Sequence, residues 1–382
     1  MDHSPDRYAI GAAVAAIAVG FTLCANAGGR AEHASSVEVG ADESESTLPA
    51  LLASAQALAQ SGHHEEAIPI LQRALTITRA QYGLFDLRQQ DVLKALAASL
   101  TAVERLPEAQ DLMIYRVRTA EKAYGEGNPK VIPAACELGD WFAEVGMSLQ
   151  ARMAYYMALN IVGTTDSLDA PIIVEPLRGI ARTRMRAQSY PVSMLRRSLG
   201  PMLGAPIGSA PRAGQRLVSL NREGEEALKR ALRIVEADPE ASPQTLIETL
   251  IQMGDWYQIK KLPREALPYY QRAWQHSRTA PSPSSSASTT LNVPVRVYYP
   301  TPQIVGNAPA VHAQENYVQV EFTVAADGSV QDARIVDRDA SDRYAQDIFD
   351  AVRASSFRPK FVDGQPVAAP GITYREVFWT GG

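Results

Sequence analysis

The sequence predicts an all-α helical repeat followed by a small C-terminal α+β domain. Alanines at the start of helical segments recur within residues 48–278, at first every 42 residues. Near the C-terminal end, apolar and polar residues alternate one by one, which is typical of half-buried strands. A segment rich in proline and serine lies between the two patterns. The 382 residues are enough for two or three domains with cores of their own.

The helical part repeats the same short pattern. Residues 58–67 read as the end of one helix, a glycine-containing turn and the start of a second helix. The alanine that begins the second helix returns after 109 − 67 = 42 and 151 − 109 = 42 residues, and later after 266 − 227 = 39 residues, as Ala67, Ala109, Ala151, Ala227 and Ala266. The pattern resembles tetratricopeptide repeats, whose usual period is about 34 residues. The longer period resembles the repeats of kinesin light chains, so we expect a tetratricopeptide solenoid.

Two segments of the repeats are near copies of each other, Leu138-Gly139-Asp140-Trp141-Phe142 and Met253-Gly254-Asp255-Trp256-Tyr257. The tryptophans are expected in the core between helices. Asp140 and Asp255 are expected to face the concave groove, where carboxylates suit a basic or amide-rich peptide. A hydrolase that uses the two carboxylates is the alternative. The aspartates lie on different repeats without a partner acid or base, which argues against it.

The N-terminal residues 1–27 are typical of a secretory signal. Ile10–Leu23 is an almost unbroken apolar run that follows Arg7, and Ala25-Asn26-Ala27 provides a small-x-small cleavage site. An uncleaved membrane anchor is the alternative, because Asp2 and Asp6 leave the leading region poorly basic. In both cases the rest of the chain is expected outside the cytoplasm, and it meets a membrane only if this segment is retained.

Three further segments are expected to lie outside regular structure. Residues 28–47 are polar and acidic, which predicts a disordered lead-in. Residues 190–215 carry several prolines and glycines, which predicts a long loop. Residues 279–291 form the Pro/Ser segment, which predicts a flexible linker between the repeats and the domain at 292–382.

Composition and motifs argue against an enzyme. The net charge of −5 excludes a broad basic surface for nucleic acid. The six histidines show no metal-binding spacing, and no nucleotide loop or catalytic motif of the common kinds is present. We expect no cofactor, no metal and no catalytic residues.

The C-terminal residues predict a β-β-α-β order. Residues 317–324 alternate between apolar and polar, and Asp327-Gly328 supplies the positive φ angles of a tight hairpin before the return strand 330–337. Tyr344, Ile348 and Val352 then share one helical face. A last strand follows at 372–379. This order predicts a three-stranded antiparallel sheet backed by one helix.

Residues 298–379 resemble the C-terminal domain of the TonB family. The similarity rests on the Tyr-Pro motif before the sheet, the hairpin turn, and the Phe-Arg-Pro segment after the helix, which are Tyr299, Pro300, Asp327, Gly328, Phe357, Arg358 and Pro359. In that family the last strand is an exposed edge that pairs with an extended peptide of an outer-membrane receptor. The resemblance implies such an edge at Thr373, Tyr374, Arg375, Glu376 and Val377. The alternatives are that this strand only completes the sheet or pairs with a second copy.

The two patterns together predict an exported periplasmic scaffold that binds proteins through its repeats and its TonB-like domain. The alternative is a membrane-anchored TonB-type energy transducer for outer-membrane receptors. Transducers of that family carry a long proline-rich spacer, and here the repeats stand in its place.

Overall fold

The computed structural model describes residues 41–162, 170–188, 213–279, 291–300, 302 and 314–380. The predicted signal or anchor, most of the predicted loop at 190–215, and the Pro/Ser segment lie outside these residues. The chain forms two compact units, Met1–Leu138 and Gly139–Gly382, and the boundary falls inside a helix.

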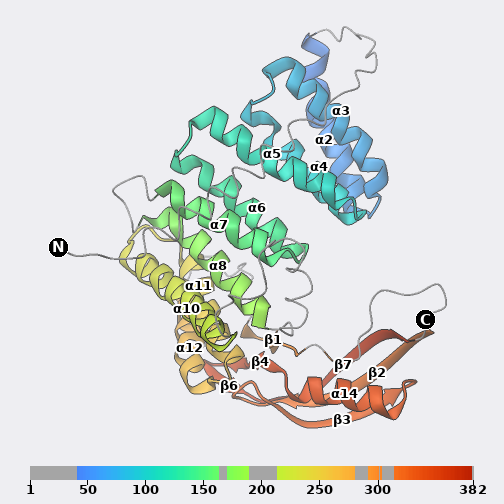
Figure 1. Ribbon diagram of the computed structural model, residues 1–382, viewed down its shortest axis with the longest axis vertical. Coiled ribbons are helices and arrows are strands. Elements are labelled where there is room, and N and C mark those ends of the chain that lie inside the picture. The colour runs from blue at the N-terminus through green and yellow to red at the C-terminus, as the bar shows by residue number, and fades with distance from the viewer. Residues whose placement is uncertain are drawn as a thin grey trace. The chain divides into compact units, whose positions relative to one another are not determined.

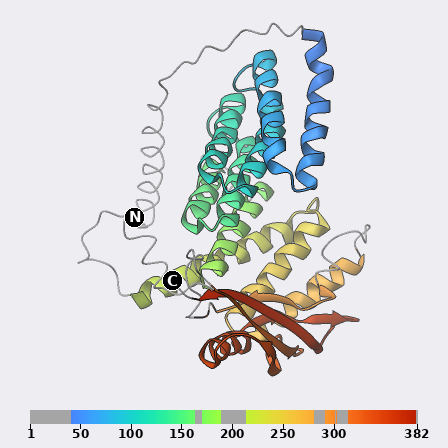
Figure 2. The ribbon, with the colours of Figure 1, turned by 90° about the vertical axis from the view of Figure 1, so that its right-hand side faces the viewer.

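The first unit consists of helices packed in consecutive pairs (Figure 2). They are α2 (Ala41–Gln60), α3 (His64–Tyr82), α4 (Gln90–Ala102), α5 (Leu106–Tyr124) and the first half of α6 (Ile132–Glu144). Because α2 begins at Ala41, the predicted disordered lead-in is wrong for residues 41–47.

The period of 42 residues is confirmed by the short 3-10 turns that precede the first helix of a pair. These turns are η2 (Leu87–Gln89), η3 (Pro129–Val131) and η4 (Pro171–Ile173), so their starts differ by 129 − 87 = 42 and 171 − 129 = 42. Gly83 and Gly125 end the preceding helices with φ of 93° and 96°. This left-handed backbone suits glycine, which explains why both connectors begin with it.

The second unit continues the helix pairs and adds the sheet domain (Figure 1). Its helices after α6 are α7 (Ser148–Val162), α8 (Val174–Gln188), α10 (Ala213–Ala237), α11 (Pro243–Ile259) and α12 (Pro263–Thr279). The helices predicted on either side of the long loop are thus present as α8 and α10, and α10 begins inside the range predicted as loop. The helical-repeat prediction is confirmed.

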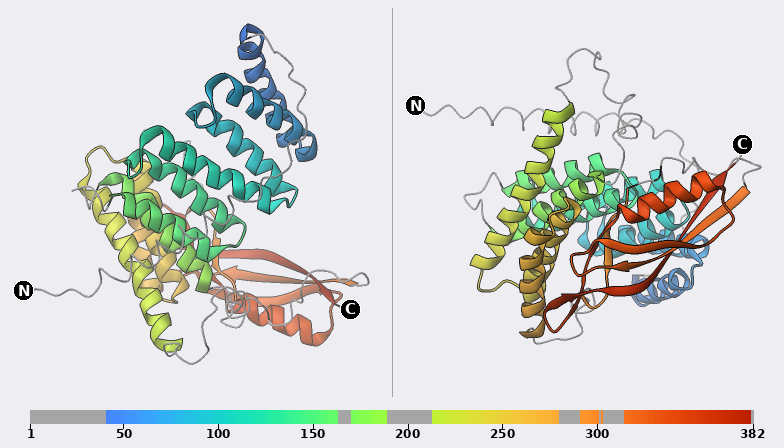
Figure 3. Two further views of the ribbon diagram at one scale, coloured as in Figure 1. Left: turned by 45° about the horizontal axis from the view of Figure 1, so that its top comes forward. Right: turned by 90° about the horizontal axis from the view of Figure 1, so that it is seen from below.

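The C-terminal domain has the predicted β-β-α-β order with two small additions. Its central antiparallel sheet has the order β3-β2-β7, and α14 packs on it (Figure 3). The additions are the two-stranded sheets β1–β4 and β5–β6. The bounds are β1 (Val295–Tyr298), β2 (Gln314–Val324), β3 (Val330–Arg338), α14 (Asp342–Arg353), β4 (Ser356–Arg358), β5 (Lys360–Val362), β6 (Gln365–Val367) and β7 (Ala369–Thr380).

One face of the central sheet forms a core with α14. Val318, Val320 and Phe322 of β2 are buried against Ile348 and Val352 of α14. The alternation along β2 places every second side chain on this face. The other face carries the polar residues of the same strand, so the sequence pattern and the observed burial agree.

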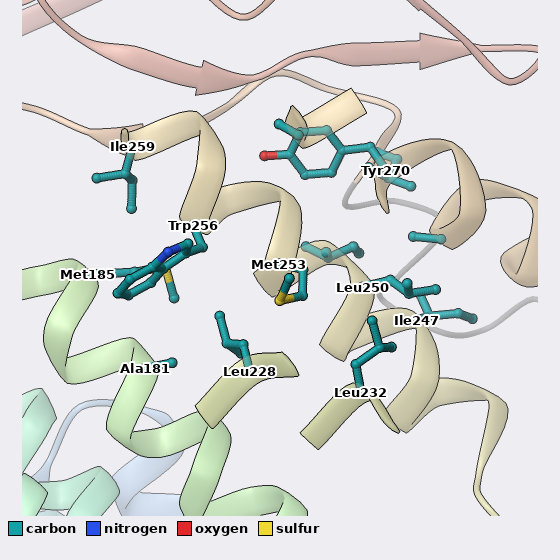
Figure 4. Packing of buried hydrophobic residues seen from close by; sticks show 14 of the residues in the cluster. Ala181, Met185, Leu228, Leu232, Ile247, Leu250, Met253, Trp256, Ile259 and Tyr270 are labelled. Atoms are coloured by element: carbon teal, nitrogen blue, oxygen red, sulfur yellow. The ribbon is translucent and has the colours of Figure 1, made fainter. Parts of the chain in front are cut away.

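A second core joins the last helices to the C-terminal domain. It is built around Trp256 of α11 and Tyr270 of α12, with Met253 and Leu228 beside them (Figure 4). Phe361 of β5 belongs to the same buried cluster, and Val297 and Tyr298 of β1 pack against it. The last helix pair and the C-terminal domain therefore share a core, whereas the predicted flexible linker between them lies almost entirely outside the described residues.

Candidate partner-binding surfaces

The predicted edge strand β7 lies at one end of the central sheet. It pairs with β2 on one side over its whole length, from Gln314↔Thr380 to Val324↔Ala369. Within the part of the chain that the structure describes, no strand is paired with its other side. Thr373–Val377 lies in the middle of this strand, so its main chain has the position that adding a further strand requires.

The five residues of the predicted edge divide between two faces. Tyr374 packs against the core under α14, whereas Thr373, Arg375 and Val377 are exposed on the opposite face. The guanidinium of Arg375 lies 3.7 Å from the ring centroid of Tyr317 on β2. Side-chain contacts with a peptide at this edge would therefore come from the outer face.

Tyr299 of the predicted Tyr-Pro motif is fixed on the inner face of the same strand. Its hydroxyl donates to Glu376 at 3.2 Å, and its ring meets that of Tyr374 edge-on at 5.6 Å. The guanidinium of Arg296 lies over both rings, at 4.5 and 4.3 Å. Burial, together with Glu376, raises the pKa of Tyr299 well above its ordinary value. The motif thus anchors the segment that leads into the domain.

Asp140 lies at the contact between two consecutive repeats. Its Oδ1 accepts hydrogen bonds from the hydroxyl of Tyr155 on α7 and from Nη2 of Arg182 on α8, both at 2.6 Å. Glu175 accepts a further bond from Arg182 at 2.7 Å. Although burial opposes the charge of Arg182, these carboxylates raise its pKa above the usual range. The side chain of Asp140 remains 42% exposed.

Asp255 has the corresponding contacts, but its arginine comes from the C-terminal domain. The hydroxyl of Tyr270 on α12 donates to Oδ1 at 2.9 Å. Nε and Nη2 of Arg358 on β4 donate to Oδ1 and Oδ2 at 2.9 and 2.6 Å. The side chain of Asp255 is 15% exposed. Both of its carboxylate oxygens are thus engaged inside the chain, and the predicted open groove position is not present at Asp255.

The other family-motif residues build the hairpin turn and its contact with the core. Gly328 has φ of 81°, and its carbonyl accepts from the amide of Phe357 at 2.9 Å. A Cβ on Gly328 would lie 2.0 Å from the Phe357 oxygen and 2.3 Å from Nε2 of Gln258, so only glycine fits. Phe357 and Pro359 are buried, and the side chain of Asp327 accepts from Ser329.

Two further contacts with the C-terminal domain, from Gln258 on α11 and from Lys261 just after it, were not predicted from the sequence. Gln258 donates to the carbonyl of Asp327 at 2.7 Å, and Lys261 donates to the carbonyl of Ala354 at 2.6 Å. Lys261 has φ of 60°, although it is not glycine. At the equivalent position, two earlier repeats carry Gly62 and Gly146 and a third carries Glu104, so the sequence offered only a weak signal for Lys261.

The described residues show neither a metal centre nor a membrane span. In the ranges that the structure covers, no group of three histidine, cysteine, aspartate or glutamate side chains is placed to hold a metal ion. None of the helices in these ranges is both long and apolar enough to cross a membrane.

Comparisons with known proteins bear on the sheet domain and on the helices separately. No curated protein matches the sequence significantly. Among solved structures, the chain is similar to BtubC (BKLC) from P. vanneervenii, at 14% identity and a TM-score of 0.43, over 75% of this chain and 97% of that chain. It is also similar to a putative kinesin light chain of Podosopora anserina with nearly identical TPR-like repeats, at 16% identity and a TM-score of 0.42, over 62% of this chain and 98% of that chain. Residues 310–375, which hold most of the sheet, α14 and the first half of the edge strand, match the family model described as Gram-negative bacterial TonB protein C-terminal.

Proposed function

We propose that this protein is a non-catalytic, exported adaptor of the periplasm, which binds one protein partner at the β7 edge and another along its repeats. The match of residues 310–375 to the TonB C-terminal family supports an envelope location and a binding role. The observation that carries the proposal is the β7 edge, whose main chain is paired on one side only among the described residues.

The edge binds an extended peptide of its partner by strand addition. Main-chain hydrogen bonds supply the affinity in this mode, and side-chain positions along the edge supply the specificity. Thr373 and Val377 lie on the outer face beside the open side of the strand. Tyr374 and Glu376 support the strand from the inner face through their contacts with Tyr299.

The opposite edge of the sheet offers a matched control. β3 is the other outer strand, and Val336 on it is 41% exposed, compared with 38% for Val377 on β7. β3 carries Asp332 at a positive φ of 51°, and its register with β2 shifts twice. Irregularities of this kind protect an edge from pairing. A photo-crosslinking residue at Val377 should therefore capture an envelope protein, and one at Val336 should not.

The crosslinking experiment is done in cells, with the full chain. The photo-crosslinking residue is placed at Thr373, Val377 or Val336 in turn, and the captured peptide is identified by mass spectrometry. We expect one extended segment of an outer-membrane protein at both β7 positions. Absence of any product from β7, or equal products from Val336, would exclude strand addition at this edge.

The repeats provide the second surface. Asp140 keeps almost half of its side chain exposed beside Arg182 and Glu175, whereas Asp255 is enclosed. We therefore propose that Asp140, and not Asp255, contacts the partner in the groove of the repeats.

The proposed periplasmic location has its own test, since a periplasmic adaptor should have Gly28 as its mature N-terminus. Recovery of the chain from the inner membrane with residues 1–27 intact would instead favour the energy transducer.

A further inference from the structure

We propose that the TonB-like domain takes the place of the next repeat at the end of the helical array, so that α11, α12 and the domain move as one rigid body. Terminal repeats of such arrays require a cap, because each repeat buries its apolar face only against its neighbours. In this chain the cap is itself the domain that carries the proposed binding edge.

The first support is the equivalence of Arg358 and Arg182. Each aspartate accepts from a tyrosine that follows it by 155 − 140 = 15 or 270 − 255 = 15 residues. Each also accepts from an arginine Nη2 at 2.6 Å. Arg182 belongs to the next repeat, since 182 − 140 = 42, whereas Arg358 belongs to β4. The domain thus supplies the contact that a following helix supplies elsewhere.

The second support comes from the residues that pack on the rings of Tyr155 and Tyr270. The ring of Tyr155 lies against Gly139 and also against Gly179 of α8 in the next repeat, where added Cβ atoms would lie 2.7 and 2.3 Å from Cε1. The ring of Tyr270 lies against Gly254 in the same way, with 2.3 Å to an added Cβ. Phe361 of β5 meets the Tyr270 ring edge-on at 6.2 Å. The buried side chain of Phe361 thus packs on Tyr270 where the first helix of a further repeat would otherwise pack.

The third support is the row of polar contacts along α11 and the turn after it. Asp255, Gln258 and Lys261 follow one another at intervals of three residues and each contacts the domain, through Arg358, the Asp327 carbonyl and the Ala354 carbonyl. Lys261 also reaches the carbonyl of Ser355 at 3.2 Å. These carbonyls end α14, where the helix dipole favours a positive charge. Three independent bonds to three parts of the domain fix its orientation.

The strained turn at Lys261 points to the same conclusion. At the equivalent position three earlier repeats carry Gly62, Glu104 and Gly146, all with positive φ. Glycine adopts this backbone without strain, and lysine does not. Glu104 has the same backbone away from the domain, whereas the side chain of Lys261 donates to the carbonyls of Ala354 and Ser355 in the domain.

The test measures the distance between the two parts in the full chain. Spin labels are placed at Glu265 on α12 and Gln346 on α14, which are both exposed, in a chain with the changes Cys24→Ser and Cys136→Ala. Pulsed electron spin resonance should give one narrow distance distribution. Arg358→Gln and Lys261→Gly should each broaden it at least twofold. Lys261→Gly relieves the positive-φ turn while it removes the side chain that contacts the domain, so strain in the turn cannot explain its effect.

The matched controls act at the equivalent positions of other repeats. Arg182→Gln makes the same change as Arg358→Gln, and Glu104→Gly changes the position equivalent to Lys261, both away from the domain, so both should leave the distribution narrow. A broad distribution in the unsubstituted chain would overturn the proposal. A narrow distribution that survives both Arg358→Gln and Lys261→Gly would overturn it as well.

Discussion

Asp140 and Asp255 occupy equivalent places in two nearly identical sequences, but their surroundings differ in exposure. Asp140 lies between repeats, where its side chain is 42% exposed and that of Arg182 is 30% exposed. Asp255 lies between the repeats and the sheet domain, where its side chain is 15% exposed and that of Arg358 is 8% exposed. Both aspartates accept from a tyrosine and an arginine, but Arg358 donates through two nitrogens to Asp255, whereas Arg182 donates through one to Asp140 and also pairs with Glu175. The two sites therefore differ in solvent exposure and in how the arginine is shared.

This difference shows how one local pattern can have two energetic roles. An exposed ion pair contributes about 0–1 kcal/mol, because water and salt screen it. A buried pair that loses one partner costs about 3–5 kcal/mol, because the remaining charge is left without compensation. The aspartate–arginine pair therefore contributes little to stability between repeats, whereas breaking the pair at the domain junction is costly.

The largest expected effect comes from removing the arginine at each site. Arg358→Met should lower the opening free energy of α11 by about 3 kcal/mol, since it leaves the Asp255 carboxylate buried without a cation. Arg182→Met should lower the opening free energy of α6 by less than about 1 kcal/mol. Hydrogen exchange resolved by mass spectrometry reports both helices in one experiment.

A double substitution shows whether Arg358→Met lowers stability through the unpaired charge of Asp255 or through lost packing. Asp255→Asn combined with Arg358→Met removes both charges and keeps an acceptor for Tyr270, so it should recover much of the lost stability. Equal losses for Arg358→Met and Arg182→Met would show that exposure does not distinguish the sites.

The glycines before the aspartates give the next largest effect. A Cβ on Gly254 would lie 2.3 Å from Cε1 of Tyr270, and a Cβ on Gly139 would lie 2.7 Å from Cε1 of Tyr155. Overpacking of a core costs about 1–3 kcal/mol. We expect Gly254→Ala to lie near the upper end of this range and Gly139→Ala near the lower end. The melting temperature followed by near-ultraviolet circular dichroism checks both, and the opposite order would contradict this account.

Much of the architecture was predictable because it depends on local pattern. The 42-residue period follows from small residues that recur where helices approach, and the 3-10 turns repeat it. The hairpin of β2 and β3 follows from alternation and from Asp327-Gly328, whose glycine has the expected positive φ. The burial of Trp141 and Trp256 was also predicted and is confirmed. These features need only a few neighbouring residues to be recognised.

The domain junction was not predictable, because its partners are far apart in the chain. Arg358 meets Asp255 across 358 − 255 = 103 residues, and neither a period nor a motif connects them. The three-residue strands β4, β5 and β6 are too short to show alternation. The start of α2 was missed for another reason, since acidic residues suit both a disordered segment and a first helical turn.

The smallest expected effect concerns the tyrosine hydroxyls and is best seen at alkaline pH. Burial, together with the nearby Asp255, raises the pKa of Tyr270 well above its ordinary value, and burial with Asp140 raises that of Tyr155. A raised pKa means that the folded chain holds the proton more tightly than the unfolded chain. The resulting stability is complete below about pH 10, the pKa of an unfolded tyrosine, and is lost as the pH rises further.

Tyr270→Phe and Tyr155→Phe should therefore each make unfolding less sensitive to alkaline pH, while costing about 1 kcal/mol at neutral pH. We expect the larger change for Tyr270, because solvent screens the carboxylate of Asp140 more than that of Asp255. Absorbance of tyrosinate during an alkaline titration identifies the groups that ionise only on unfolding. If Tyr270 titrates in the folded chain like an exposed tyrosine, the hydroxyl is not enclosed at the junction and the contrast between the two sites fails.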